Sequence, residues 1–573
     1  MRILLLVHAF NSLSQRLYVE LARDGHELSV ELDIHDWVTC EAVELFRPDV
    51  ILAPFLKRAI PASVWRGCLS LIVHPGPPGD RGPSALDWAI LGGAETWGVT
   101  VLQAVEEFDA GPVWGSASFR MRAASKGSLY RREVSDGAVS AVREALARFA
   151  AGMGPLADVA GGGIRHGWQP PLRQAQRAID WSRDDTATVL RKIRSADGFP
   201  GVEDVLFDHR YGLFDAHVET RLTGRTGKVI ARRHGAICRA TRDGAVWIGQ
   251  LRPLVGSERG FKRPAVLALG SLVDALPAFD EDAMGAAAAD EEVRYEERGA
   301  VGYLHFDLYN GALSTEQCQR LRAAYAHARR RPTRVIVLMG GADFWCNGMH
   351  LHCIEAAASP ADASWANINL IDDLARDILT TDTHLTVAAL HGNAAAGGVF
   401  LALAADRVLA RSGIVLNPHY RNMGNLYGSE YWTYLLPRRV GDAQAQAIMS
   451  RRLPLGAPEA HAIGLIDGHA GPDTAAFRAR VDVHAAGLAS DRRFAQTLGD
   501  KRARRERDEG SRPLADYRAD ELAHMRMNFY GFDPSYHIAR HRFVHRTPQA
   551  WTPLHLAGHR RAAVHHRREP ANA

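Results

Sequence analysis

Short apolar runs alternate with stretches of helical periodicity through the first part of the chain. Ile3–Val7, Val50–Ala53 and Leu69–Val73 have the length and composition of buried strands, and Glu27–Ile34 has β character. Between them, segments such as Ser14–Arg23 carry apolar residues at helical spacing. Strands that alternate with helices indicate a parallel sheet covered on both faces. The pattern therefore predicts an α/β domain at the start of the chain.

The pattern changes at two later places. Gly161–Gly163 and Pro170–Pro171 mark a first boundary, after which Ala175–Ile193 has helical spacing and short strands then alternate with turns. The acidic stretch Asp280–Glu297, which contains a run of alanines, is typical of a solvated linker. A second α/β pattern begins at Gly299, and the final part of the chain combines helical spacing with many Arg and His residues.

We therefore predict an α/β multidomain protein. Its parts are a Rossmann-like domain over 1–160, a small OB-like β-barrel over 161–278, an acidic linker over 279–296, a second α/β domain over 297–475 and a helical, basic region over 476–573. The length of 573 residues fits this division, since a domain typically takes roughly 150 residues.

Composition and charge narrow the function. Hydrophobic residues make up 46% and charged residues 23%, which is the balance of an ordinary globular protein. The formal net charge of +4 is small for this length and argues against nucleic-acid binding. No apolar run reaches the roughly 18 residues of a membrane span, MRILLLVHAF lacks the features of a signal peptide, and the cysteines are scattered. These observations favour a cytoplasmic protein without nucleic-acid or membrane partners.

The first candidate site lies in the segment IVHPGPPGDRGPSALDWAILGG. His74 directly follows a predicted strand and precedes a Pro/Gly loop and a helix, which places it where ligands of open α/β sheets bind. Asp109 lies in a second Gly/Pro loop, within EEFDAGPVWG. A histidine can protonate a leaving group near neutral pH, and a carboxylate can orient its imidazole. We therefore predict His74 and Asp109 as a catalytic pair.

This segment resembles the formyltetrahydrofolate-dependent formyltransferase family, and the resemblance covers roughly residues 1–270. The family pattern is a His-Pro loop ending in Arg-Gly, a helix with Trp, then Gly-Val-Thr and Asp-x-Gly, and the matches are His74, Pro75, Arg81, Gly82, Trp88, Gly98, Val99, Thr100, Asp109 and Gly111. Arg177–Gly201 is similar to the small C-terminal barrel of the family. The resemblance implies 10-formyltetrahydrofolate as the formyl donor.

The chain departs from this family at one position. Many members carry Asn two residues before the histidine, where this chain has Ile72, although a branch that hydrolyses formylfolate has Ile there too. Nearby polar residues are candidates for binding the folate or a phosphate. These are Asn11, Gln15 and Arg16 in the first strand–helix loop, and Arg81 in the loop after His74.

The second candidate site lies within residues 297–471. Val301–Gly341 has the pattern of a strand, a turn, an amphipathic helix and a strand, and FWCNGMHLH and ALHGNAAAGGVFLALAADRVLA follow. These segments resemble the enoyl-CoA hydratase/isomerase (crotonase) family, whose Gly-rich turn and later Asp are matched by Gly392 and Asp406. The resemblance implies a crotonase fold, an acyl-coenzyme A substrate, and an oxyanion hole made by the backbone N–H groups of Met349 and Gly397.

Two departures from the crotonase pattern change the expected chemistry. Hydratases use two glutamates to deliver water, and this chain has Phe400 at the first of those positions and His419 at the second. Because neither residue replaces a carboxylate in activating water, we do not expect the chain to hydrate a double bond.

The polar and aromatic stretch Asn417–Gly441 stands in place of the hydratase glutamates. We predict Tyr420 and Glu430 as a new acid/base pair. Tyr427, His419 and Arg421 are the alternates. For any one of the tyrosines, packing in the core or in an interface is the commoner role.

Two clusters, one of histidines and cysteines and one of histidines alone, are candidates for metal binding. Cys346, His350, His352 and Cys353 lie within eight residues, but their spacing is not that of a known zinc finger or ribbon, so we predict no metal there. The second cluster is His537, His541 and His545, which share one face of a predicted helix. A ligand-binding face stays open as one interpretation of this second cluster, but we predict that the protein binds no metal.

The same predicted helix is basic, and this favours another interpretation of it. Its arginines are Arg540, Arg542 and Arg546. Guanidinium groups bind phosphates well, so we predict that the helix is solvated or faces coenzyme A, with Arg542 and Arg546 as the binding residues.

The two modules together resemble one family along the whole chain. Their order, the linker and the stretch NPHYRNMGNLYGSEYWTYLLPRRVG are similar to a family of [NiFe]-hydrogenase maturation proteins. The resemblance implies that the first module moves formyl from 10-formyltetrahydrofolate to the coenzyme A thiol, which leaves tetrahydrofolate. The second module would then split formyl-CoA into carbon monoxide and coenzyme A. It also implies hydrogenase maturation proteins as partners.

Two other functions stay open. In the first, the formyl acceptor is an amine and the second module is an isomerase or a thioesterase. In the second, the chain is a non-enzymatic maturation scaffold built from two degenerate enzyme domains. The presence of His74, Asp109 and Gly397 argues against a scaffold, which has no need of them.

Overall fold

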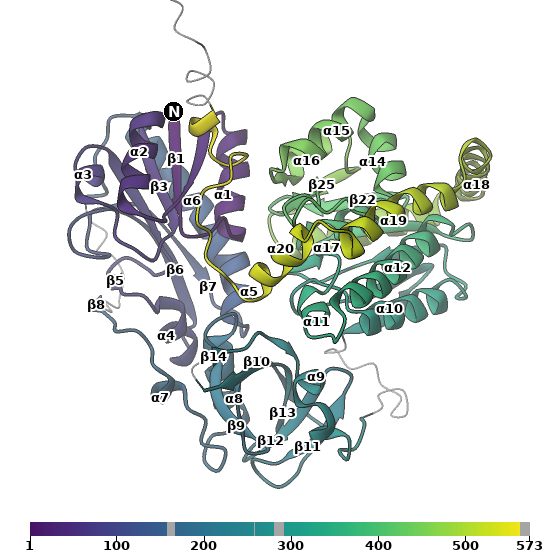
Figure 1. The fold of residues 1–573 in the computed structure, drawn as a ribbon, viewed down its shortest axis with the longest axis horizontal. Coiled ribbons are helices and arrows are strands. Elements are labelled where there is room, and N and C mark those ends of the chain that lie inside the picture. Colours follow the sequence, from purple (N-terminus) through teal and green to yellow (C-terminus); the bar gives the residue numbers. More distant parts are fainter. Residues whose placement is uncertain (158–166, 257, 280–291, 562–573) are drawn as a thin grey trace, which may run out of the picture. The chain divides into compact units, whose positions relative to one another are not determined.

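The computed structural model describes residues 1–157, 167–256, 258–279 and 292–561, and it divides into two compact units (Figure 1). Unit 1 comprises Met1–Met284 together with the residues from Pro548 onward, and unit 2 comprises Gly285–Thr547. The first predicted boundary, at Gly161–Gly163, lies outside the described residues. The predicted α/β multidomain fold is confirmed, and each unit is described by itself below.

A mixed sheet forms the centre of unit 1, with strand order β2-β1-β3-β4-β6-β7. Its strands are β1 (Arg2–Val7), β2 (Glu27–Leu32), β3 (Val50–Phe55), β4 (Leu69–His74), β6 (Thr96–Gln103) and β7 (Val113–Arg120). The first four strands pair in parallel, as predicted, whereas β6 and β7 run antiparallel to their neighbours. The short loop between β6 and β7 explains the antiparallel pairing of these two strands, because a parallel connection needs a crossover of a dozen residues or more.

Helices cover both faces of this sheet. Leu4 and Leu6 of β1 pack with Ala42 and Phe46 of α2 (Asp36–Phe46) on one face. The residues of β1 between Ile3 and Val7 are all buried, so the other face of the strand is covered too. The helices α1 (Ser12–Arg23) and α6 (Ser135–Ala150) contact each other and pack on strands of the sheet.

The predicted barrel follows. Its main strands are β9 (Val202–Leu206), β10 (His209–Glu219), β11 (Val229–Arg233), β12 (Ala236–Ala240) and β13 (Ala245–Val255), in the order β11-β12-β13-β10-β9. The helix predicted over Ala175–Ile193 is two helices, α7 (Gln174–Arg177) and α8 (Thr186–Ala196). Between them Asp180 accepts hydrogen bonds from the backbone and the hydroxyl of Ser182, and such local bonds compete with a helix.

Residues 552–560 lie on β2, which is an edge strand of the first sheet. The N–H of Val30 donates to the carbonyl of Leu556 (3.1 Å), and the N–H of Leu32 donates to Thr552 Oγ1 (2.9 Å). The buried carboxylate of Glu31 contacts His559 Nε2 at 2.9 Å and Arg560 Nε at 2.8 Å. The sequence predicted one helical region over 476–573, but this part of it belongs to unit 1, because its backbone and side chains bond to β2.

Replacing His559 and Arg560 together by alanine should destabilise unit 1. Glu31 would remain buried without a cation, and breaking a buried ion pair on one side costs about 3–5 kcal/mol. The free energy of unfolding can be followed by urea denaturation. Arg561→Ala is the matched control, because that arginine donates to the carbonyl of Leu554 and not to Glu31. Equal stability of the two variants would contradict the prediction.

Unit 2 contains a six-stranded sheet in the order β16-β17-β18-β20-β22-β25. The strands are β16 (Val293–Arg298), β17 (Val301–Phe306), β18 (Val335–Leu338), β20 (Leu385–Leu390), β22 (Arg407–Arg411) and β25 (Gly468–Ala470). Only β16 is antiparallel to its neighbour. Residues 280–291 of the predicted linker lie outside the described residues, but its last part is strand β16 rather than linker, since Val293 to Arg298 pair along β17.

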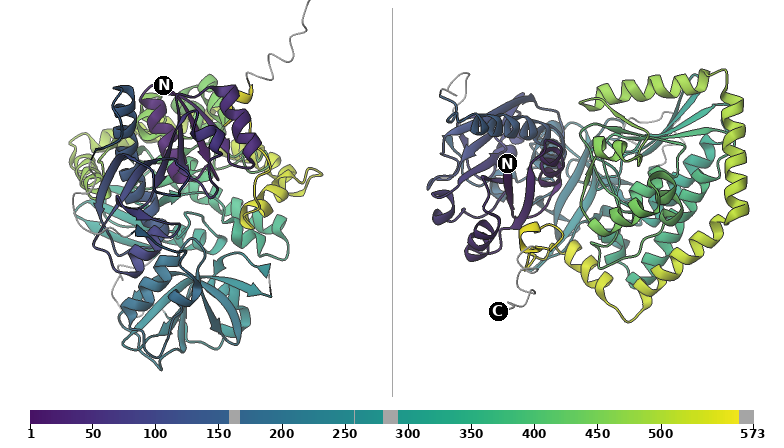
Figure 2. Two further views of the ribbon diagram at one scale, coloured as in Figure 1. Left: turned by 90° about the vertical axis from the view of Figure 1, so that its left-hand side faces the viewer. Right: turned by 90° about the horizontal axis from the view of Figure 1, so that it is seen from above.

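A smaller sheet and long helices complete unit 2. The smaller sheet is β19 (Phe344–Cys346), β21 (Asn393–Ala395), β23 (Val415–Asn417) and β24 (Leu455–Gly456). The helices α17 (Thr474–Ser490), α18 (Phe494–Ser511) and α19 (Leu514–Tyr530) follow one another around the outside of the unit (Figure 2). Then α20 (Ser535–Val544) ends it. Within the described parts of the chain, no helix has the length and apolar character needed to cross a membrane.

Candidate active sites

In unit 1, His74 lies between two carboxylates at the end of β4. Its Nε2 is 2.8 Å from Asp80 Oδ2, and its Nδ1 is 3.7 Å from Asp109 Oδ1. His74 and Asp80 are both buried. The predicted pair of His74 and Asp109 therefore does come together. Asp80 was missed, although it lies in the same Pro/Gly loop, because nothing in its spacing sets it apart.

The loops around His74 explain the Gly/Pro pattern of the sequence. A Cβ atom on Gly76 would overlap Asp80 Oδ2 and His74 Nε2, so only glycine leaves room for their hydrogen bond. The N–H of Gly82 donates to Asp109 Oδ2 at 3.1 Å. Asp109 itself has a φ of 52°, a conformation that is costly for a residue other than glycine and is common at active sites.

The predicted folate-binding residues lie in internal contacts. Arg81 pairs with Glu107, and Asn11 caps α1 by accepting from the N–H of Ser14 at 3.0 Å. Gln15 Nε2 donates to the carbonyl of Phe10 at 3.0 Å. Arg16 Nε lies 2.9 Å from Glu20 Oε1, and Arg16 Nη1 lies 3.3 Å from Asp136 Oδ1. A role for these residues in binding stays a prediction.

In unit 2, the predicted oxyanion residues lie beside each other. Helix α13 (Gly397–Leu403) begins at Gly397, so the N–H of Gly397 has no partner within its own helix. A Cβ atom on Gly348, the neighbour of Met349, would be 3.3 Å from that nitrogen. Ala396 has a φ of 48°, and this strained turn sets the direction of the Gly397 N–H.

The predicted acid/base pair is a hydrogen-bonded pair next to Gly397. The hydroxyl of Tyr420 lies 2.6 Å from Glu430 Oε2 and 2.8 Å from the carbonyl of Ser429. A Cβ atom on Gly397 would overlap Glu430 Oε1, so the carboxylate reaches the start of α13. Tyr420 and Glu430 are both buried. The chain thus holds a phenol and a carboxyl group at the start of α13, beside the predicted oxyanion donor Gly397.

Burial changes the proton affinity of this pair. Burial, reinforced by the negative charge of Asp372, raises the pKa of Glu430 to about 8. Burial and the Glu430 charge raise the pKa of Tyr420 well above its ordinary value. The phenol is therefore protonated at neutral pH. Glu430 gains and loses its proton at a pH only slightly above neutral. A carboxyl group with such a pKa can act as both acid and base.

Two further carboxylates hold the segment that carries Glu430, and the sequence interpretation missed both. Asp372 accepts from the N–H of Glu430 and from Ser429 Oγ, each at 2.8 Å. Glu521 of α19 accepts from the N–H groups of Tyr431 (2.9 Å) and Thr433 (2.8 Å). Burial raises the pKa of Asp372 to about 6 and that of Glu521 to about 8.

These bonds stabilise a strained backbone. Glu430 and Tyr431 have φ angles of 60° and 59°, which few residues other than glycine adopt. The carboxylates of Asp372 and Glu521 accept from their N–H groups and so fix this conformation. The strained backbone thus sets the position of the Glu430 carboxyl group.

The positions of the missing hydratase glutamates are filled differently. Phe400 is fully buried and its ring stacks on Tyr420, with centroids 5.3 Å apart and planes at 16°. His419 is buried as well. The alternate Tyr427 stacks on His524 at 4.1 Å and, with Arg421 and Trp432, lines a cavity of about 360 Å³. Tyr427 thus lies beside a cavity rather than in the Tyr420–Glu430 pair.

The remaining candidates lie on short helices of unit 2. His350 Nδ1 accepts from the N–H of Cys353 at 3.2 Å and caps α11 (Leu351–Glu355). Arg542 and Arg546 are exposed, on α20 and just after it. Both guanidinium groups are accessible from solvent. Their role in coenzyme A binding stays a prediction.

Comparisons with known proteins agree with this division. The C-terminal domain of formyl transferases matches residues 171–258, and the enoyl-CoA hydratase/isomerase family matches residues 296–498. The chain is 54% identical over 560 residues to hydrogenase maturation factor HoxX of Bradyrhizobium diazoefficiens, which covers 98% of this chain and 97% of that protein. It is also similar to a crystal structure of HypX from Aquifex aeolicus in complex with tetrahydrofolic acid, with a TM-score of 0.94, 48% identity, and 98% and 99% of the two chains covered.

Proposed function

The chain belongs to the HoxX and HypX family of hydrogenase maturation factors, and from that we propose that it makes carbon monoxide for the [NiFe]-hydrogenase active site. It does so in two steps, with coenzyme A carrying the formyl group between them. The observation that carries the proposal is the buried Tyr420–Glu430 pair beside Gly397, in a crotonase-like site with Phe400 in place of a hydratase glutamate.

The first step is the transfer of formyl from 10-formyltetrahydrofolate to coenzyme A in unit 1. The thiol sulfur attacks the formyl carbon, the bond from that carbon to the folate nitrogen breaks, and the thiol proton ends on that nitrogen. His74 moves this proton, while Asp80 and Asp109 hold its imidazole in place. The tetrahydrofolic acid bound in the crystal structure of HypX supports folate as the substrate.

The second step is the cleavage of formyl-CoA in unit 2. The carboxylate of Glu430 accepts the formyl proton, the carbon–sulfur bond breaks, carbon monoxide leaves, and the thiolate takes up a proton from the Tyr420–Glu430 pair. The N–H groups of Met349 and Gly397 hold the formyl oxygen meanwhile. Phe400 fills the place from which a hydratase would deliver water, and so protects the thioester from hydrolysis.

One assay separates this function from its alternatives. The protein is incubated with 10-formyltetrahydrofolate and coenzyme A, and carbon monoxide is detected by its binding to a haem reporter. Carbon monoxide that depends on both substrates is the expected result. Formate without carbon monoxide would instead indicate a thioesterase, and an unchanged formylfolate would indicate another acceptor or a scaffold.

Coenzyme A should bind to the protein with an affinity that falls as salt rises, because its phosphates pair with exposed cations. Arg542→Ala should weaken binding about tenfold, as expected for the loss of one hydrogen bond to a charged group. Calorimetry over a range of salt concentrations measures both effects. Arg210→Ala, which removes an exposed arginine of the barrel, is the control. An absence of binding would end the formyl-CoA mechanism.

A further inference from the structure

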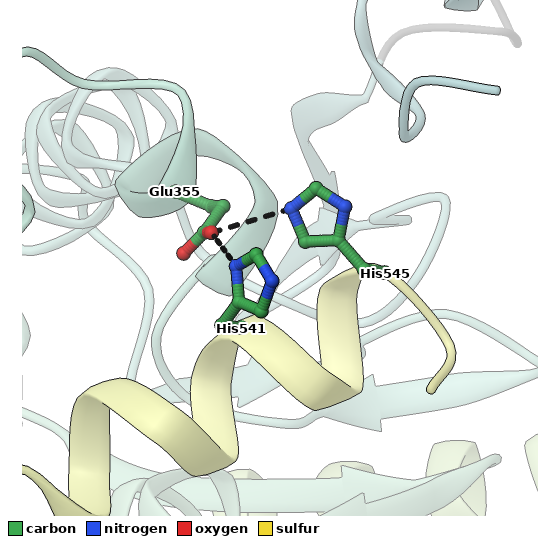
Figure 3. Close-up of side chains that lie close together, drawn as sticks. All are labelled: Glu355, His541 and His545. Carbon is green, nitrogen blue, oxygen red and sulfur yellow. Dashed lines mark hydrogen bonds and ion pairs between the residues drawn. The ribbon is translucent and has the colours of Figure 1, made fainter. Parts of the chain in front are cut away.

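Three side chains converge in unit 2 at a place that neither active site uses. They are Glu355, the last residue of α11, His541 of α20, and His545, which directly follows α20 (Figure 3). Glu355 Oε1 lies 2.8 Å from His541 Nδ1 and 3.3 Å from His545 Nε2. One oxygen and two imidazole nitrogens thus face a common point.

The sequence spacing produces this arrangement. His541 and His545 are four residues apart, so a helix places them on one face, one turn above the other. Their ring centroids are 4.1 Å apart. Helix α11 brings Glu355 to the same face, and Figure 3 shows its carboxylate pointing at both rings.

The neighbours of Glu355 fix its orientation. Its side chain is only 11% exposed, and its second oxygen, Oε2, accepts from Arg540 Nε at 2.7 Å. This bond leaves Oε1 directed at the two histidines. Arg540 is in turn 2.7 Å from His537 Nδ1, and His537 Nε2 lies 2.9 Å from the carbonyl of Phe529. His537, the third histidine of the predicted face, therefore belongs to the support of the cluster and not to its ligand set.

We propose that Glu355, His541 and His545 bind a Zn²⁺ ion, or another late first-row divalent metal ion, that fastens α20 to α11. Two imidazoles and a carboxylate are a ligand set that suits Zn²⁺, whereas Mg²⁺ and Ca²⁺ prefer sites made of oxygen. Zinc bonds of about 2.0–2.1 Å at tetrahedral angles place neighbouring ligand atoms about 3.3 Å apart. The distance from Glu355 Oε1 to His545 Nε2 has this value, and the distance from Glu355 Oε1 to His541 Nδ1 is 2.8 Å. The three ligand atoms all lie within 4.8 Å of one another, so small side-chain movements bring them around one ion.

The surroundings leave a way in for the ion. The side chains of His541 and His545 are 58% and 34% exposed, so a metal ion can enter from solvent and keep a water as its fourth ligand. Arg540 acts on the ion indirectly, since outer groups that hold a ligand in place contribute to affinity. Its positive charge also keeps the cluster neutral before the metal binds.

The test counts tight Zn²⁺ sites on the full chain after removal of any purification tag, by competition with a chromophoric chelator. His541→Ala, His545→Ala and Glu355→Gln should each remove one site. Changes outside the ligand set of a metal site cost 10–100-fold in affinity, so the loss of a ligand should cost about 100-fold or more. His209→Ala, which removes an exposed histidine of the barrel, is the control and should keep the full count. His537→Ala removes a support of Arg540, so it should weaken binding less than the loss of a ligand does.

Co²⁺ gives a second measurement. The protein should bind it with the visible absorption of a tetrahedral ion, and this absorption should disappear in His545→Gln, which removes an exposed side chain and should not disturb folding. Circular dichroism checks the fold of each variant. A count that is the same in all variants, or a chain that binds no Zn²⁺ tightly, would overturn the proposal and leave the cluster as an ion pair.

Discussion

Glu430→Gln should abolish the release of carbon monoxide while formyl is still removed from the folate. Glutamine keeps the shape of the side chain and can still accept from the Tyr420 hydroxyl, but it cannot take up the formyl proton. A single general base contributes about 10²–10⁴ in rate, so the loss should be easy to detect with a haem reporter. Formyl-CoA, or formate from its slow hydrolysis, should accumulate instead.

Tyr420→Phe tests the other partner of the pair. It removes the hydroxyl that lies 2.6 Å from Glu430 and keeps the ring that stacks on Phe400, so the packing should survive. We expect a similar loss of carbon monoxide release. Tyr530→Phe, which removes an exposed hydroxyl on α19, is the control. Normal release in both site variants would move the chemistry to Tyr427 or His419.

The same reaction should depend on pH in a defined direction. Glu430 acts as a base only when ionised, and burial with the Asp372 charge raises its pKa to about 8. Carbon monoxide release in single turnovers should therefore rise with pH, reach half of its maximum near pH 8 and level off above that pH. Asp372→Asn removes a negative charge next to Glu430, so it lowers the Glu430 pKa and moves the rise to lower pH. An unmoved profile would show that another group controls the rate.

His74→Ala should stop the consumption of 10-formyltetrahydrofolate. The imidazole contacts both Asp80 and Asp109, and its loss removes the group that we propose to move the proton to the folate nitrogen. The expected loss is again about 10²–10⁴. The absorbance of the folate measures consumption directly.

Changes at the two carboxylates should follow the same pattern. Asp80→Asn and Asp109→Asn keep the size of each side chain but replace the carboxylates that orient the His74 imidazole, so both should slow formyl transfer. His209→Ala, an exposed histidine of the barrel, should behave as the wild type. Supplied formyl-CoA should still yield carbon monoxide in the His74 variant. A His74 variant that consumes formylfolate normally would refute the assignment.

Both candidate catalytic pairs were predicted from short segments of the sequence. His74 was predicted because it directly follows a strand and precedes a Gly/Pro loop, and Asp109 because it lies in a second Gly/Pro loop. Tyr420 and Glu430 were predicted because they lie in one unusual stretch. Both pairs are in contact in the structure, although their catalytic roles remain predictions.

What the sequence did not reveal depends on distant contacts. Asp372 and Glu521 lie about 60 and 90 residues from the backbone N–H groups that they accept from, on helices whose charges are typical of solvated faces. The strand β16 was hidden by its acidic composition, because only its pairing with β17 makes it a strand. Likewise, no local pattern links His559 to Glu31.

That last contact has a consequence for the order in which the protein is made. The backbone N–H of Leu32 donates a hydrogen bond to Thr552 Oγ1, and these two residues are 520 positions apart in the sequence. A ribosome adds about 5–20 residues per second. For roughly 25–100 s after β2 emerges, its edge is therefore uncovered and Glu31 has no cation. An exposed strand edge can pair with another chain. During this interval the uncovered edge of β2 distinguishes the nascent first sheet from the finished one, and chaperones or proteases can bind it.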